Sequence, residues 1–157
     1  MKSGFDYKEY ANWVKKLEIA EKDFQLWLKQ FLLEQAQRVV AKGKPRTPVD
    51  TGFLRNSWYI GSQHIVQKAD WSSPSKSGNV RAAIDWSKSD IASIAVVGSY
   101  LEVEIGLSAD YASFIEYGQR SYQGKYMLTI SIDEVQRQLP ARFNQQWFEF
   151  LKSRGVV

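Results

Sequence analysis

Three carboxylates are the side chains of this chain that are best placed to do chemistry. Asp50, Asp110 and Glu116 stand in two short blocks of the sequence, and paired carboxylates can act as general acid and general base in a hydrolase. Simpler structural roles compete with this one. Asp50 can cap a single helical turn over residues 51–56, and Asp110 can cap a short helix that follows it. A small carboxylate-dependent hydrolase is therefore an alternative interpretation of the chain.

Glu116 is expected to need a partner of opposite charge. It lies near the end of the predicted short helix, residues 111–117, where the helix dipole disfavours a carboxylate. We expect a partly buried ion pair with Arg55, because a bidentate guanidinium–carboxylate pair holds its geometry well. Ser108 is a second candidate to cap this helix, and Gly118 is suited to end it.

The remaining residues with catalytic potential do not form a complete site. His64 is the only histidine, which excludes two-histidine zinc motifs and leaves a Ser-His triad this one residue to use. Residues 118–125 resemble a phosphate-binding loop only faintly, because their glycines are six apart rather than five and Tyr126 replaces the hydroxyl that would hold magnesium. The sequence therefore predicts no catalytic, cofactor-binding or metal-binding residue, and no cofactor.

The charge and the absence of cysteine limit the kinds of protein that this chain can be. The net charge of +4, from 21 basic and 17 acidic residues, is small, and the basic residues are scattered along the 157-residue chain. Charge alone does not identify a nucleic-acid-binding protein. The absence of cysteine excludes a disulfide framework and fits assembly in a reducing cytoplasm. Seven charged residues among the first twenty leave no apolar core for a signal peptide or a membrane span.

Two helices are predicted before residue 43, a lead helix over 5–16 and a long one over 17–42. The long helix carries apolar residues at three- and four-residue spacing, which places them on one face; they are Leu17, Ala20, Phe24, Trp27, Leu28, Phe31, Leu32 and Val39. Leu33 and Val40 widen that face. We therefore expect this helix to contact a second subunit as well as its own core.

At residues 44–57 the pattern of the sequence changes from helical periodicity to strand-like composition. Pro45 and Pro48 should stop the long helix, and a strand is predicted over 57–66. The Ser-rich stretch 67–90 reads as a long loop, a length that is uncommon in a compact domain without a function. Trp71 and Trp86 lie in this loop, and we expect them to anchor in a partner. The six Trp, eight Tyr and eight Phe of the chain also exceed the needs of one core.

A β-hairpin is predicted over 94–105 around Gly98-Ser99. Pairing Val97 with Tyr100 brings Val96 opposite Leu101 and puts the apolar residues on one face. Glu102 and Glu104 then face the other way. After the short helix and a loop, 119–124, a helix is predicted from Tyr126, with Pro140 kinking or restarting it; its apolar residues are Leu128, Ile132, Val135, Leu139, Phe143, Trp147, Phe150 and Leu151.

These elements predict one α+β domain over residues 1–157. It divides into an N-terminal helical segment, 1–43, a turn and β-sheet region, 44–107, with the inserted loop 67–90, and a short helix and C-terminal helices, 108–157. We expect a small antiparallel sheet packed against the long N-terminal helix and the C-terminal helices.

Three blocks of the sequence resemble the signature of a known family. The first reads Thr-Pro-Val-Asp-Thr-Gly-x-Leu-Arg-x-Ser, and its signature residues are Thr47, Pro48, Asp50, Thr51, Gly52, Leu54 and Arg55. The second contributes Tyr111, Ala112, Glu116 and Gly118, and the third spans residues 124–128. Together they resemble a tail-component family of long-tailed bacteriophages, whose members are tail-completion or head–tail joining proteins of the neck.

The resemblance implies a structural role in the virion and no enzyme. It implies a ring, expected to be a hexamer, around the DNA channel, with a head-completion or connector protein on one side and a tail tube or tail terminator protein on the other. Non-specific contact with DNA in the channel is compatible with this role, and no membrane is involved. The expected location is the virion neck or tail, after assembly in the host cytoplasm. A basic nucleic-acid-binding regulator remains the other alternative, and it would need a concentrated positive face.

Overall fold

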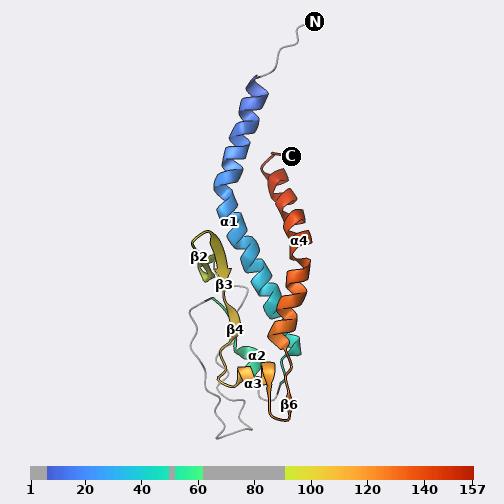
Figure 1. Ribbon diagram of the computed structural model, residues 1–157. Coiled ribbons are helices and arrows are strands. Elements are labelled where there is room, and N and C mark those ends of the chain that lie inside the picture. Colours follow the sequence, from blue (N-terminus) through green and yellow to red (C-terminus); the bar gives the residue numbers. More distant parts are fainter. Residues whose placement is uncertain (1–6, 50–51, 62–90) are drawn as a thin grey trace.

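Two long antiparallel helices form the body of the molecule; most of the small elements gather around one of its ends, and one hairpin lies beside the long N-terminal helix (Figure 1). The computed structural model describes residues 7–49, 52–61 and 91–157. The long helices are α1 (Tyr7–Arg46) and α4 (Met127–Ser153). The small elements are α2 (Phe53–Asn56), β1 (Trp58–Ile60), η2 (Ile91–Ser93), β2 (Ile94–Val97), β3 (Tyr100–Val103), β4 (Ile105–Leu107), α3 (Ala112–Tyr117), β5 (Gly118–Gln119) and β6 (Tyr122–Gln123). The predicted α+β class is confirmed.

Helix α1 is one continuous helix of 40 residues. The predicted division at residues 16 and 17 is wrong, and so is the expectation that Pro45 stops the helix. Pro45 lies inside the last turn, and the amide of Thr47 still donates to the carbonyl of Gly43 at 3.1 Å. Pro140 likewise lies inside α4, which runs on without a break. Each proline removes one amide donor from its helix, but packing of the two helices against each other maintains both.

An aromatic ladder joins the middle of α1 to the C-terminal half of α4. Its rings pack with centroids 5.1–5.5 Å apart across the two helices; they belong to Phe24, Trp27, Phe31, Phe143, Trp147 and Phe150. Rings at these distances bury large apolar areas and add favourable edge-to-face geometry. Much of the aromatic surplus noted in the sequence is therefore used within the subunit.

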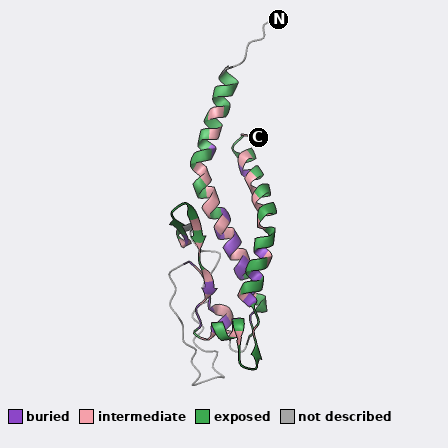
Figure 2. Cartoon of the chain, viewed as in Figure 1, coloured by how far each residue is buried: buried purple, intermediate pink, exposed green. Residues whose placement is uncertain are grey.

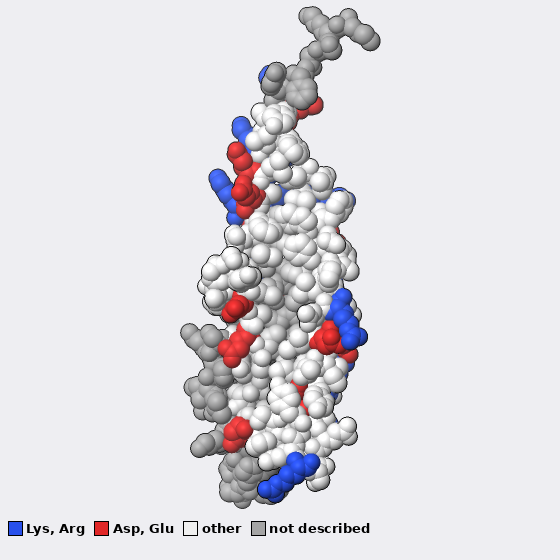
Figure 3. Space-filling view, in the orientation of Figure 1, with Lys and Arg blue, Asp and Glu red and all other residues white. Residues whose placement is uncertain are grey.

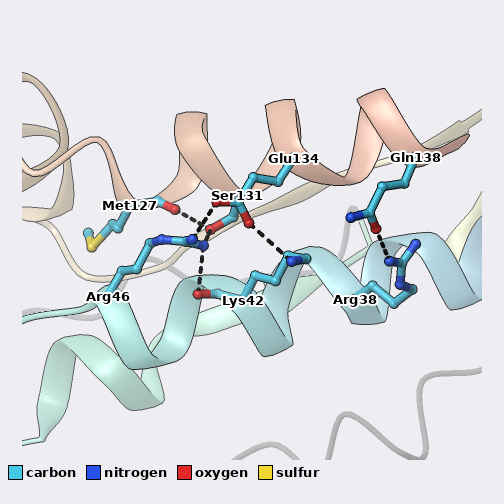
Figure 4. Close-up of polar contacts among 7 residues, drawn as sticks. All are labelled: Arg38, Lys42, Arg46, Met127, Ser131, Glu134 and Gln138. Atoms are coloured by element: carbon cyan, nitrogen blue, oxygen red, sulfur yellow. Dashed lines mark hydrogen bonds and ion pairs between the residues drawn. The ribbon is translucent and has the colours of Figure 1, made fainter.

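A polar seam joins the same two helices beside the ladder (Figure 4). The carboxylate of Glu134 accepts hydrogen bonds from Lys42 Nζ at 3.1 Å and Arg46 Nη2 at 2.6 Å, and these two cations hold the pKa of that carboxyl below its usual range. Arg46 Nη1 also donates to Ser131 Oγ at 3.1 Å, and Arg38 donates to Gln138. The seam fixes the register of α1 against α4, because each of the three cations donates to an acceptor on the opposite helix.

The strands form three two-stranded antiparallel ladders rather than one sheet: β1 with β4, β2 with β3, and β5 with β6. The predicted hairpin register is confirmed, with Val97 opposite Tyr100 and Val96 opposite Leu101. Ile94 is buried, whereas Val96 near the turn is 61% exposed. The predicted strand 101–105 divides at Glu104 into β3 and β4. Of the predicted strand 57–66, residues 58–60 form β1 and those from 62 onward lie outside the described ranges.

Burial is concentrated where the two helices meet the small elements, while the N-terminal half of α1 is mostly exposed (Figure 2). The core at that end consists of Val40, Leu54, Trp58, Ala109, Ala112 and Met127. All three recognised blocks of the sequence contribute to it, through Leu54, Ala112 and Met127. The fold therefore uses these blocks to connect α1, the strands and α4.

Candidate assembly surface

Thr47 connects the end of α1 to the first strand. Its side chain is buried and its Oγ1 donates to the carbonyl of Gly43 at 3.0 Å. The same oxygen accepts a hydrogen bond from the indole Nε1 of Trp58 at 2.9 Å. Trp58 is fully buried, and a Cβ added at Gly43 would lie only 2.1 Å from its ring. Thr47 and Gly43 thus position the indole at the centre of the core.

The helical turn after α1 starts later than the sequence suggested. Helix α2 begins at Phe53, follows Gly52 in the left-handed region at φ 80°, and has no side-chain cap at that residue. Asp50, the predicted cap of this turn, and Thr51, its predicted first residue, lie outside the described residues. A positive φ at Gly52 is easily adopted without a Cβ, which explains why glycine suits this position of the block. Pro48 is exposed beyond the end of α1.

Arg55 and Glu116 do not form the predicted ion pair. Arg55 Nη2 donates to the carbonyl oxygen of Thr47 at 3.3 Å. Glu116 is buried, and its carboxylate accepts from the amides of Leu128 at 3.0 Å and Thr129 at 2.9 Å and from the Thr129 hydroxyl at 2.7 Å. No salt bridge joins Arg55 and Glu116 within the part of the chain that the structure describes.

The N-terminus of α4 is therefore the partner of Glu116 that the sequence reading missed. The residue before α4, Tyr126, makes no side-chain capping bond, so a carboxylate from α3 takes over that function. The amides of a helix N-terminus favour negative charge, and this replaces the cation that we expected. A signal was present in the sequence, since no Ser, Thr, Asp or Asn stands immediately before the predicted helix.

The caps predicted for α3 are also wrong. Its N-cap residue is Tyr111, which makes no side-chain capping bond. Ser108 is buried and its hydroxyl instead donates to the carbonyl of Ser57 at 3.1 Å, which ties β4 to β1, while Asp110 is exposed. Gly118 does end α3, with φ 83° as expected for a C-terminal glycine.

The glycines of residues 118–125 allow two backbone segments to cross closely. A Cβ at Gly118 would meet the carbonyl oxygen of Tyr122 at 2.5 Å, and one at Gly124 would meet that of Glu116 at 2.5 Å. This segment forms the β5–β6 hairpin with Arg120, at φ 51°, in its turn. The glycines are therefore explained by close packing of the backbone, and no phosphate-binding loop is needed to account for them.

Of the four residues that the sequence predicted to lie at an interface, two are buried within the subunit and two lie outside the described residues. Leu33 and Val40 are buried within the subunit, with 8% and 2% of their surface exposed. The breadth of the apolar face of α1 is thus explained by packing within one chain, and these two side chains are not available to a neighbour. Trp71 and Trp86, together with His64 and the rest of loop 67–90, lie outside the described residues.

A different surface is apolar and exposed. We name it the aromatic end: Phe114, Tyr117, Tyr122, Tyr126 and Ile130, each 42–65% exposed, with the exposed cations Arg120 and Lys125 in the same stretch of sequence. The side-chain amine of Lys125 lies 5.9 Å from the centre of the Tyr122 ring. The segment from Tyr117 to Ile132 contains no acidic residue. Tyrosine, phenylalanine and arginine are enriched at the centres of protein interfaces, and acidic residues are depleted there.

Other kinds of site find little support in the described ranges. These ranges contain no group of three or more His, Cys, Asp or Glu side chains that could hold a metal ion. The face drawn in Figure 3 is largely uncharged, and its charged residues lie in small groups near the edges, some of which combine basic and acidic side chains. None of the helices described is long and apolar enough to cross a membrane.

Comparison with known families identifies the chain. The family described as "Bacteriophage HK97-gp10, putative tail-component" matches residues 11–118, which are 108 of the 157 residues. The chain belongs to this HK97-gp10-like family of phage tail components. The match begins at residue 11 and ends at Gly118, so it contains most of α1, the first two recognised blocks and Glu116. No curated protein and no solved structure matches the chain.

Membership of the HK97-gp10-like family confirms the resemblance read from the sequence. It makes the protein a component of the phage tail, and hence of the virion, and it points to a structural rather than an enzymatic role. The motif residues agree with such a role: Thr47, Leu54, Ala112 and Glu116 are buried and hold the fold together.

Proposed function

We propose that this tail component works in the neck of the virion, where it completes the tail and joins it to the head. It does so as a hexameric ring around the DNA channel. The observation that carries the proposal is the aromatic end, where five large apolar side chains stay exposed close to the core. An exposed aromatic group of this kind favours contact with another protein, because burying it on assembly removes a large apolar area from water.

The ring requires three kinds of neighbour. Further copies of the chain would form its circumference, a head-completion or connector protein would meet one side, and a tail tube or tail terminator protein would meet the other. DNA in the channel would be contacted only through phosphates and without reading of sequence. The long helical pair, α1 and α4, provides the rigid element that would span between these neighbours.

Assembly of the purified protein tests the proposal. We expect native mass spectrometry to find a monomer or weak oligomer for the protein alone, and a closed ring after addition of the tail tube protein. Negative-stain images of the mixture should then show rings with a central channel. Monomers alone in both samples would contradict the ring.

The phage itself provides the second test. A phage lacking this gene should release DNA-filled heads and separate tails, because the step that joins them is missing. Normal, infectious particles from such a phage would exclude a role in head–tail joining.

A further inference from the structure

We propose that the aromatic end of one subunit docks on the outer face of the β2–β3 hairpin of a second copy, and that this contact builds the ring. The outer hairpin face consists of Ala95, Val97, Tyr100 and Glu102, which share one side of the ladder. The inference rests on the proposed ring and adds the two surfaces that would form it.

The outer hairpin face is apolar and acidic. All four of its residues are exposed, and Tyr100 and Val97 retain 72% and 49% of their surface. The opposite face of the ladder carries Ile94, Leu101 and Val103, which are more buried, and Val96, which is 61% exposed near the turn. No ion pair or hydrogen bond to another described residue holds the Glu102 side chain.

The aromatic end complements this face in charge and in chemistry. It presents Arg120 and Lys125 without any acid, whereas the hairpin presents Glu102 without any base. Both surfaces also carry exposed tyrosines, the residue type most useful at an interface centre. Opposite charges on two apolar surfaces steer association and fix the register of the contact.

The arrangement of these charges favours a head-to-tail contact. Two aromatic ends facing each other would bring four cations together, and two hairpins would bring carboxylates together, and both arrangements are repulsive. The favourable pairing joins two different surfaces, and a contact of this heterologous type generates rings when its rotation closes. DNA is a poorer partner for the aromatic end, because its five large apolar side chains add little to a phosphate contact.

Crosslinking tests the contact directly, since the chain contains no cysteine. Arg120→Cys and Glu102→Cys are made as separate variants of the full chain and treated with a short bis-maleimide in the presence of the tail tube protein, with which the ring should close. We expect a covalent dimer only when the two variants are mixed, and a ladder of higher species when one chain carries both changes. The matched control is Phe148→Cys, which is 57% exposed on α4 and lies 21 residues beyond Met127, about 30 Å along the helix. A mixture no more crosslinked than this control overturns the inference.

Charge reversal tests the same contact without a crosslinker. Arg120→Glu with Lys125→Glu should weaken self-association about tenfold, and adding Glu102→Lys should restore part of it. If these variants associate normally but lose salt-dependent binding to duplex DNA, the aromatic end is a DNA surface and the inference is wrong.

The outcomes separate this inference from the proposed function. A closed ring in the neck without crosslinks between positions 102 and 120 overturns the docking mode and leaves the ring. Specific crosslinks between these positions in a protein that never closes a ring support the docking mode and overturn the ring.

Discussion

The carboxylate of Glu116 caps helix α4 through Thr129, whose amide and hydroxyl both donate to the same oxygen, at 2.9 and 2.7 Å. The two residues are far from adjacent in sequence, so this bond joins α3 to α4 across the β5–β6 hairpin. A backbone hydrogen bond also joins the two segments, from the amide of Tyr126 to the carbonyl of Glu116 at 3.0 Å.

Glu116→Ala should lower the free energy of unfolding by about 2–3 kcal/mol, since it removes a buried charged acceptor and leaves helix amides without a partner. Chemical denaturation measures the change. Asp110→Asn is the matched control, because Asp110 is an exposed acid before the same helix, and it should stay within about 0.5 kcal/mol of the parent. Equal costs for the two variants would contradict the capping role.

The side chains of Arg55 and Glu116 should act independently. Arg55→Ala should cost about 1 kcal/mol through its hydrogen bond to Thr47. In a double-mutant cycle with Glu116→Ala, the coupling energy should fall within about 0.5 kcal/mol of zero. A coupling energy of several kcal/mol would restore the ion pair that the sequence had suggested.

Gly43→Ala should destabilise the protein by about 3 kcal/mol, because its methyl group has no room beside the buried Trp58 ring. In the Trp58→Phe background the cost of the same change should fall clearly, since the closest atoms belong to the outer ring of the indole. Thermal unfolding measures both. Ala41→Ser, at an exposed position of the same helix, serves as control and should have little effect. A cost for Gly43→Ala that does not depend on residue 58 would rule out this steric explanation.

The Glu134 ion pairs should make stability depend on pH. The pKa of Glu134 is lowered from 4.5 by its bonds to Lys42 and Arg46, so its contribution is present above about pH 4.5 and is lost as the pH falls through the folded-state pKa. Glu134→Gln should therefore lower the Tm at pH 7, and the difference from the parent should shrink below pH 4.5. Asp133→Asn removes a more exposed pair with Arg137 and should change the Tm less at every pH. A deficit of Glu134→Gln that persists unchanged at pH 3 would exclude this origin.

The sequence by itself determined the elements whose signal is local. The three- and four-residue spacing of apolar residues such as Trp27 and Phe31 predicted a long amphipathic helix. The Gly98 turn with its flanking β-branched residues predicted the hairpin register that the structure has. The three blocks pointed to the family that the family model confirms over residues 11–118, because short motifs in a fixed order depend on residue identity and spacing and not on tertiary contacts. Gly118 was read correctly for the same reason, since a positive φ is a property of one residue.

Only the tertiary structure decided which side chains meet. Glu116 was read as a carboxylate at an unfavourable helix end, yet the N-terminus of α4 reaches it from a distant part of the chain and replaces the expected cation. Leu33 and Val40 looked like surplus apolar surface until α4 and the core were placed against them. The exposure of Tyr117 and Tyr100 was equally invisible in the sequence, because burial depends on the sum of long-range packing around each side chain, which no local pattern encodes.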